Sequence, residues 1–150
     1  MKCTRCRQTA CTALPAHNAG FCEKCFVLYF ERQVGKAIKS QKMFSPEDSI
    51  LVALSGGKDS LALALQLKKM DYDIQGLHID LAIPDSSSSA RNLVEKFCRT
   101  HDIQVHILEM TGLGLPIPEV REKIRRPVCS VCGKIKRYYF NKFAMDNNFD

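Results

Sequence analysis

The clearest regularity in this sequence is an alternation of short apolar runs with longer amphipathic segments. Three short runs predict β-strands, at residues 50–54, 74–79 and 104–108. Three longer segments with apolar positions at helical spacing predict helices, at residues 58–70, 88–101 and 137–147. The first run, five consecutive apolar residues, is typical of a strand buried on both faces. Strands that alternate with helices favour a parallel, doubly wound α/β sheet, in which ligands bind at the carboxyl ends of the strands.

A different pattern occupies the N-terminal part of the chain. Two CxxC pairs lie fifteen residues apart and are formed by Cys3, Cys6, Cys22 and Cys25. Each pair can present two sulfur atoms to one tetrahedral ion, so the spacing predicts a four-thiolate zinc site. Because so short a knuckle has almost no core, the Zn²⁺ ion must supply its folding free energy. Cys11 and His17 lie between the pairs and are alternative ligands with less suitable spacing.

An amphipathic segment from about residue 26 to residue 42 predicts a helix after the second CxxC pair. The predicted organisation is therefore a zinc knuckle over 1–27, a linking helix over 28–48 and an α/β domain over 49–150. No apolar run approaches the length that spans a membrane, so we expect no membrane partner. The first CxxC pair follows Met1 almost at once, in place of a secretory signal, which favours metal binding in a reducing cytoplasm over disulfides.

The stretch that carries the chemistry is Ser-Gly-Gly-Lys-Asp-Ser at 55–60, between the first predicted strand and its helix. Free backbone N–H groups and the helix dipole favour an anion at this point, and adjacent glycines let the backbone approach a phosphate closely. Ser55 and Ser60 can add hydroxyl donors, and Lys58 can add positive charge. A Walker A loop is excluded because Asp59 stands where that motif needs Ser or Thr, and a dinucleotide fingerprint is excluded because the two glycines are adjacent.

Positive charge is concentrated near the C-terminus. The net charge of the chain is +6, and residues 121–142 hold eight basic residues against a single acid, Glu122. A basic block that accompanies a nucleotide site predicts a polyanionic partner such as RNA. The alternative is a helix face that is only solvated.

A third CxxC pair, Cys129 and Cys132, lies inside this basic block. Nearby lysines and arginines lower the pKa of thiols, so the pair should be a good ligand or nucleophile. Three interpretations remain open from the residues alone: a second zinc site, a redox dithiol, or part of an iron–sulfur cluster. Cys98, at an inward position of a predicted helix, is expected to be a buried core thiol.

Taken in order, these motifs resemble one family. The N-terminal knuckle, the Ser-Gly-Gly-Lys-Asp-Ser loop, the strand that ends in His-Ile-Asp at 78–80 and the segment Arg-Pro-x-Cys-Ser-x-Cys-Gly-x-x-Lys-Arg at 126–137 are similar to the tRNA 2-thiouridine synthetases. These enzymes are pyrophosphate-loop ATPases with an N-terminal zinc knuckle. Apart from the knuckle, the motifs also resemble those of the enzyme that thiolates cytidine 32.

The resemblance implies an adenine nucleotide alpha hydrolase-like fold and ATP-dependent tRNA uridine 2-sulfurtransferase activity. ATP adenylates the C2 oxygen of a uridine, and sulfur then displaces AMP. Ala53 and Ile79 would contact the adenosine, and the residues implied to hold the ATP phosphates are Ser55, Gly56, Gly57, Lys58, Asp59 and Ser60. The implied catalytic residues are Cys129, Cys132 and Lys136, the two cysteines also being ligands of a [4Fe–4S] cluster. Mg²⁺, a tRNA substrate, a sulfur donor such as a ubiquitin-like sulfur-carrier protein, and a homodimer are implied as well.

Members of this family continue well past the point at which this sequence stops, through another strand and the third cluster cysteine. We therefore expect a C-terminally truncated chain whose strand at 50–54 has an open edge, through which it aggregates or dimerises. Two alternative functions are a cytidine-32-type thiolase, against which the knuckle argues, and a zinc- and RNA-binding module without catalysis.

Overall fold

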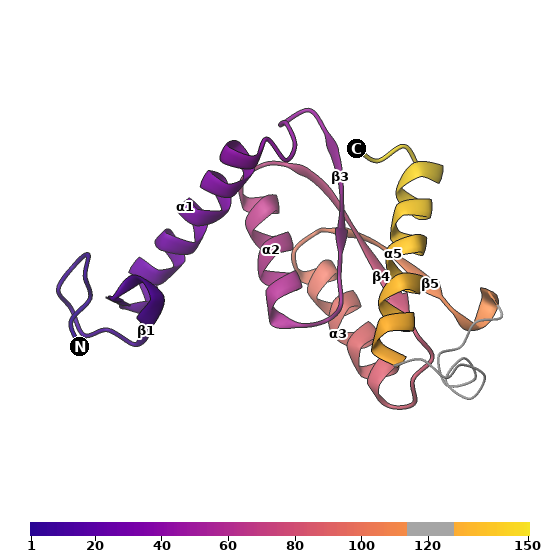
Figure 1. The fold of residues 1–150 in the computed structure, drawn as a ribbon, viewed down its shortest axis with the longest axis horizontal. Helices are drawn as coiled ribbons and strands as arrows, with labels where there is room; N and C mark the ends of the chain where they lie inside the picture. Colours follow the sequence, from indigo (N-terminus) through magenta and orange to yellow (C-terminus); the bar gives the residue numbers. More distant parts are fainter. Residues whose placement is uncertain (114–127) are drawn as a thin grey trace. The chain divides into compact units, whose positions relative to one another are not determined.

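The computed structural model describes residues 1–113 and 128–150, with side chains up to Gly112 and from Ser130 onward. The chain forms two compact units, Met1–Ser45 and Pro46–Asp150, which are described separately below (Figure 1). None of the helices in the described part of the chain is long and apolar enough to cross a membrane.

The first unit is a small β-hairpin followed by a long helix. Its elements are β1 (Thr12–Leu14), a 3₁₀ turn (Pro15–His17), β2 (Ala19–Phe21) and α1 (Glu23–Gln41). β1 and β2 pair antiparallel, with Thr12 opposite Phe21. The buried centre holds Cys3, Phe21 and Cys25, and Phe21 stacks on Tyr29 of α1 with ring centroids 4.9 Å apart. The apolar core of this unit is therefore small, and two of its three buried residues are cysteines.

Helix α1 begins three residues earlier than the sequence predicts, so Cys25 lies in its first turn. Cys22 is the N-cap, and its carbonyl oxygen accepts the N–H of Phe26 at 2.8 Å. The helix ends at Gln41, and its C-cap Lys42 adopts a left-handed conformation with φ of 48°. The second CxxC pair is therefore held by a helix start, which fixes the direction of both thiols.

The second unit is a parallel sheet of three strands with helices on both faces (Figure 1). Its elements are β3 (Ser49–Ala53), α2 (Lys58–Lys69), β4 (Asp73–Asp80), α3 (Ser86–Thr100), β5 (Gln104–Glu109), a 3₁₀ turn (Thr111–Leu113) and α5 (Val128–Asp146). The strand order is β3-β4-β5, and the register sets Ala53 beside Leu77 and Ile79 beside Leu108. The parallel α/β fold predicted from the alternating pattern is confirmed.

Alternation along β5 shows which helix covers which face. The ring of His106 contacts that of Phe143 in α5, with centroids 5.0 Å apart, whereas the carboxylate of Glu109 pairs with Arg91 of α3. Successive side chains of a strand point to opposite faces, so α5 and α3 lie on opposite sides of the sheet. The α5 side has a core of Ile79, Leu81 and Met110, on which Tyr139 and Phe140 pack.

Two details differ from the sequence prediction. The strand β3 is not buried on both faces. Ile50 and Val52 are buried, but Ala53, at the end of the strand, is exposed and lines a cavity. Helix α5 begins at Val128, nine residues before the predicted start, and includes Gly133. Cys132 and Ile135 pack on the core below α5, and this packing outweighs the low helix propensity of the glycine.

The outer edge of β3 meets the last residue of the chain. The N–H of Asp150 donates to the carbonyl oxygen of Ser49 at 3.1 Å, and the carboxylate of Asp150 accepts the N–H of Ser49 at 2.9 Å. Because both groups of Ser49 point away from β4, Asp150 lies on the free side of the strand.

Candidate nucleotide site and metal centre

A cavity of about 180 Å³ lies at the carboxyl ends of β3 and β4. Its walls come from both strand ends, from the start of α3 and from α5. The lining residues are Ala53, Leu54, Ser55, His78, Ile79, Leu81, Ile83, Ser86, Ser87, Ala90, Lys136 and Phe140. The wall is mostly apolar, with a few polar side chains, which is the usual composition of a small-ligand site.

The loop that leaves β3 is held by hydrogen bonds of its two serines. The hydroxyl of Ser60 donates to the carbonyl oxygen of Gly57 at 3.0 Å and accepts the N–H of Ser55 at 3.3 Å. Ser55 Oγ lies 3.2 Å from Ser60 Oγ and accepts the N–H of Gly57 at 3.3 Å. The N–H groups of the first turn of α2, at 58–60, have no partner within the helix. The serines therefore shape the loop and leave a positive helix start open to an anion.

Glycine is present at positions 56 and 57 of the loop for different structural reasons. Gly56 has φ of +83°, and a Cβ there would lie 3.2 Å from the carbonyl oxygen of Ala90. Gly57 has an ordinary backbone conformation, and a Cβ there would meet only Ser55 Oγ, at 3.4 Å. The fold thus requires a glycine at 56, whereas the space beside Gly57 is open and available to a ligand.

Lys58 and Asp59 project from the loop into solvent. Their side chains form an ion pair of 2.9 Å, and both are 90 % exposed. Such an exposed pair contributes little to stability. Both charges are therefore free to rearrange around a polyanion and its metal ion.

The other residues that the sequence singles out fall into three places. Ala53, Ile79 and Lys136 line the cavity together with Ser55. Cys132 is half-buried and packs on the core of Ile79, Leu81 and Met110 that borders it. Cys129 belongs to the first turn of α5, but its side chain lies outside the described residues, as do the four basic residues between 121 and 126. Lys134, Arg137 and Lys142 are exposed on α5.

His78 is a site residue to which the sequence assigned no role. It lines the cavity, is 4 % exposed, and its Nδ1 lies 2.7 Å from the carbonyl oxygen of Leu54. The available signal was a histidine two residues before the carboxyl end of β4. The sequence places His78 at the carboxyl end of a predicted strand, where ligands of parallel α/β sheets bind, but it gives no contact or role for the side chain.

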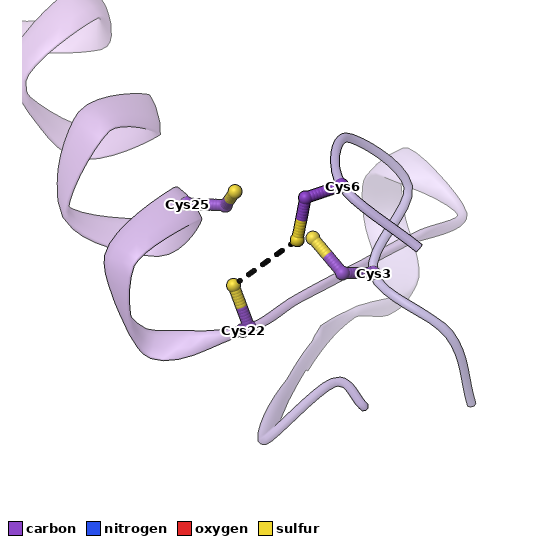
Figure 2. A group of neighbouring side chains, drawn as sticks. All are labelled: Cys3, Cys6, Cys22 and Cys25. Carbon is purple, nitrogen blue, oxygen red and sulfur yellow. Dashed lines mark hydrogen bonds between the residues drawn. The ribbon is translucent and has the colours of Figure 1, made fainter. Parts of the chain in front are cut away.

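The four N-terminal cysteines form a cluster in the first unit. Their sulfur atoms all lie within 4.8 Å of one another, and those of Cys6 and Cys22 are 3.5 Å apart. Figure 2 shows the thiols of Cys3 and Cys6, from the N-terminal loop, turned toward those of Cys22 and Cys25 at the start of α1. These distances suit one tetrahedral ion with metal–sulfur bonds of about 2.3 Å. The predicted metal-binding cluster is confirmed as a set of donors.

The alternative ligands lie outside this cluster. The thiol of Cys11 is 3.5 Å from the carbonyl oxygen of Phe21, and the ring of His17 packs edge-on against Tyr29. Each is occupied by contacts of the hairpin and the helix, so neither competes with the four cysteines.

The environment of the cluster separates the pKa values of its thiols. A hydrogen bond from the backbone at Cys6 lowers the pKa of Cys3 to about 6, whereas burial, with neighbouring thiols, raises the pKa of Cys25 to about 12. Four thiolates this close repel one another unless a cation shares them. The donor set therefore fits a divalent metal such as Zn²⁺.

Comparison with known proteins finds matches to both units. Residues 2–27 match the family described as the N-terminal LIM domain of the 2-thiouridine synthetase TtuA, and residues 27–125 match the PP-loop domain family. The chain is 40 % identical to a tRNA-5-methyluridine(54) 2-sulfurtransferase of Thermotoga maritima and 43 % identical to one of Pyrococcus horikoshii, over 100 % of its own length. It covers 50 % and 48 % of these relatives, so it spans about half the length of the curated relatives it matches.

A solved structure has the same fold. The U34-tRNA thiolase NcsA from Methanococcus maripaludis, described with its [4Fe–4S] cluster, aligns with a TM-score of 0.86 at 24 % identity. The alignment covers 100 % of this chain and 51 % of that one. At this identity the likeness supports the arrangement of elements and carries no site residue across.

Proposed function

We propose that this chain, which belongs to the PP-loop domain family, is the ATP-binding part of a tRNA uridine 2-sulfurtransferase. The activity would consist of two steps. The C2 oxygen of a uridine attacks the α-phosphorus of ATP and displaces pyrophosphate, and a sulfur nucleophile then displaces AMP from C2. The relatives that bear this name match the whole chain, and the N-terminal match agrees with the same family.

The main support for the proposal is that residues of the loop and of α5 line the same cavity. Ala53 and Ile79 offer an apolar slot for adenosine, next to Ser55 at the start of the loop. The phosphates would extend from there over the loop at 55–60, toward the N–H groups at the start of α2. Asp59 is an exposed carboxylate suited to Mg²⁺, and Lys58 adds a positive charge.

Lys136 reaches the same cavity from α5. A lysine beside the α-phosphate would stabilise the negative charge that develops as pyrophosphate leaves. Its side chain is half-buried in the cavity wall, and in the proposed complex it would act on the reacting end of the nucleotide. We assign it a catalytic role on this basis.

Cys129 and Cys132 lie one helical turn apart in α5, so both can serve one ligand group. Two thiolates fit part of the ligand set of a [4Fe–4S] cluster, which would supply the incoming sulfur when bound. No third cysteine, histidine or carboxylate joins Cys132 in a cluster among the described residues. The residues of this chain would therefore provide two ligands, with the remaining donor from elsewhere.

The other parts of the proposal rest on the family resemblance and on the relatives. The knuckle would hold Zn²⁺ and stabilise the first unit. We also propose that the chain receives sulfur from a donor such as a ubiquitin-like sulfur-carrier protein. It would form a homodimer and act in the cytoplasm.

The exposed basic residues of α5 should form a tRNA-binding surface. Replacing Lys134 and Arg137 by Glu should reduce the salt dependence of tRNA binding, lowering the slope of log affinity against log salt by about 2, because each lost phosphate contact removes about 1. Fluorescence anisotropy at several salt concentrations measures this slope. Lys68→Glu with Lys69→Glu, on exposed positions of α2, is a control of equal charge change. Equal slopes in both double variants would mean that α5 is only a solvated surface.

The function itself is tested by mass spectrometry of tRNA nucleosides from cells that lack the gene. We expect the loss of a 2-thiolated uridine and its recovery when the gene is restored. Loss of 2-thiocytidine would instead support the cytidine-32-type enzyme. An unchanged set of thiolated nucleosides would contradict the sulfurtransferase and leave a zinc- and RNA-binding module.

A further inference from the structure

One buried side-chain nitrogen, on a residue that lines the cavity, has no hydrogen-bond partner among the residues that the structure describes. It is Nε2 of His78, on a side chain that is 4 % exposed and lines the cavity. Most buried polar atoms of folded proteins are paired, so a buried nitrogen without a partner beside a ligand cavity calls for an explanation.

The bond on the other side of the ring determines what Nε2 offers. Nδ1 lies 2.7 Å from the carbonyl oxygen of Leu54, and a carbonyl oxygen can only accept. Nδ1 therefore carries the proton and donates it. In the neutral imidazole, Nε2 then holds a lone pair and is a hydrogen-bond acceptor. The missing partner is a donor, an N–H or an O–H group.

Two serines of the cavity wall are engaged elsewhere. Ser55 Oγ lies 3.2 Å from Ser60 Oγ, and Ser87 Oγ accepts the N–H of Ile83 at 3.0 Å. Most of the remaining wall is apolar, formed by Ala53, Ile79, Leu81, Ala90 and Phe140. A flat apolar ring with an N–H donor on its edge matches this combination of wall and acceptor.

We propose that Nε2 of His78 accepts a hydrogen bond from the exocyclic amine of adenine, which makes His78 a specificity-determining residue of the nucleotide site. The inference rests on the proposed function, because it requires ATP in this cavity. Adenine carries an amine at C6, whereas guanine and hypoxanthine carry a carbonyl oxygen there. Those bases would set an acceptor against the lone pair of Nε2 and leave both without a donor.

The test compares ATP with purine riboside 5′-triphosphate, which lacks the amine, by titration calorimetry on the full chain with Mg²⁺. The key variant is His78→Asn, whose amide can still donate to Leu54 but which has no acceptor at the place of Nε2. The wild-type chain should bind ATP about tenfold more tightly than the analogue. The variant should lose about tenfold for ATP and nothing for the analogue, so that the preference disappears.

A second readout does not depend on the variant folding. In the ¹⁵N-labelled wild-type chain, the Nε2 resonance of His78 should move when ATP binds and stay unchanged with the amine-free analogue. An unmoved Nε2 resonance would overturn the assignment, and so would an equal ATP preference in wild type and His78→Asn. Loss of affinity for 2′-deoxy-ATP, without discrimination against the amine-free analogue, would assign the donor to the ribose and overturn it too.

The two proposals fail in distinguishable ways. If the chain binds ATP but ignores the amine, the role of His78 is wrong and the nucleotide site stands. If the folded chain binds neither nucleotide, the proposed function fails and the role of His78 fails with it.

Discussion

Gly57→Val should abolish ATP binding without unfolding the chain. A Cβ at this position meets only Ser55 Oγ, at an ordinary contact distance of 3.4 Å, and the backbone at Gly57 is extended, with φ of −78° and ψ of 153°. A valine fits this conformation, but its methyl groups would fill the space beside the start of α2 that a phosphate needs. We expect the dissociation constant for ATP to rise by at least about 100-fold, which is about 2.7 kcal/mol. Titration calorimetry measures the affinity, and thermal unfolding checks the fold.

Gly56→Ala is the matched control. Its main effect should be on the stability of the fold, whereas that of Gly57→Val is on ATP affinity. Gly56 has φ of +83° and lies against the backbone of Ala90, so a side chain there strains the fold. We expect unfolding to become easier by about 1–2 kcal/mol, lowering the melting temperature of the second unit by roughly 5 °C. Unchanged ATP affinity in Gly57→Val would show that the loop at 55–60 does not hold the phosphates.

Cys22→Ser should prevent zinc binding and unfold the first unit. Cys22 is the N-cap of α1, and its sulfur lies 3.5 Å from that of Cys6 in the four-thiol cluster. We expect the folding free energy of so small a unit to come largely from the metal, since structural Zn²⁺ sites supply about 10–16 kcal/mol. A hydroxyl is a poor substitute for a thiolate as a zinc ligand. Metal analysis after mild chelation should find one zinc per wild-type chain and almost none in the variant. The melting temperature of the second unit should not change.

Cys11→Ser provides the control for this prediction. Cys11 lies in the same unit but outside the cluster, with its thiol near the carbonyl oxygen of Phe21. It should retain one equivalent of zinc. Full zinc in Cys22→Ser, or loss of zinc in Cys11→Ser, would mean that the ligand set differs from the four clustered cysteines.

Much of the site could be predicted because its signals are local. The apolar run before Ser55 and the amphipathic pattern after Lys58 place the loop between a strand and a helix, and the structure has both elements there. The four cysteines were predictable for a similar reason, because the CxxC spacing presents two thiols from each pair. In both cases a few consecutive residues determine the local backbone geometry of the site.

The rest depends on contacts between distant segments. Lys136 reaches the cavity because Tyr139 and Phe140 of the same helix pack on the core of Ile79, Leu81 and Met110. The local sequence around Lys136 does not show this packing. The early start of α5 has the same cause, since tertiary packing overrides the low helix propensity of Gly133. The sequence places His78 at the expected ligand end of the sheet but does not predict its contact, because the hydrogen bond of its Nδ1 is to Leu54, 24 residues away.

We propose that ATP binds with its phosphates on the loop at 55–60 and its base in the cavity between β3, β4 and α5. A ¹H–¹⁵N correlation titration of the full chain with ATP and Mg²⁺ tests it most directly, because it locates the nucleotide residue by residue. We expect saturable shifts of the amide resonances at 55–60, together with those of Ala53, Ile79 and Lys136. Absence of shifts at these residues, or shifts confined to the first unit, would contradict it.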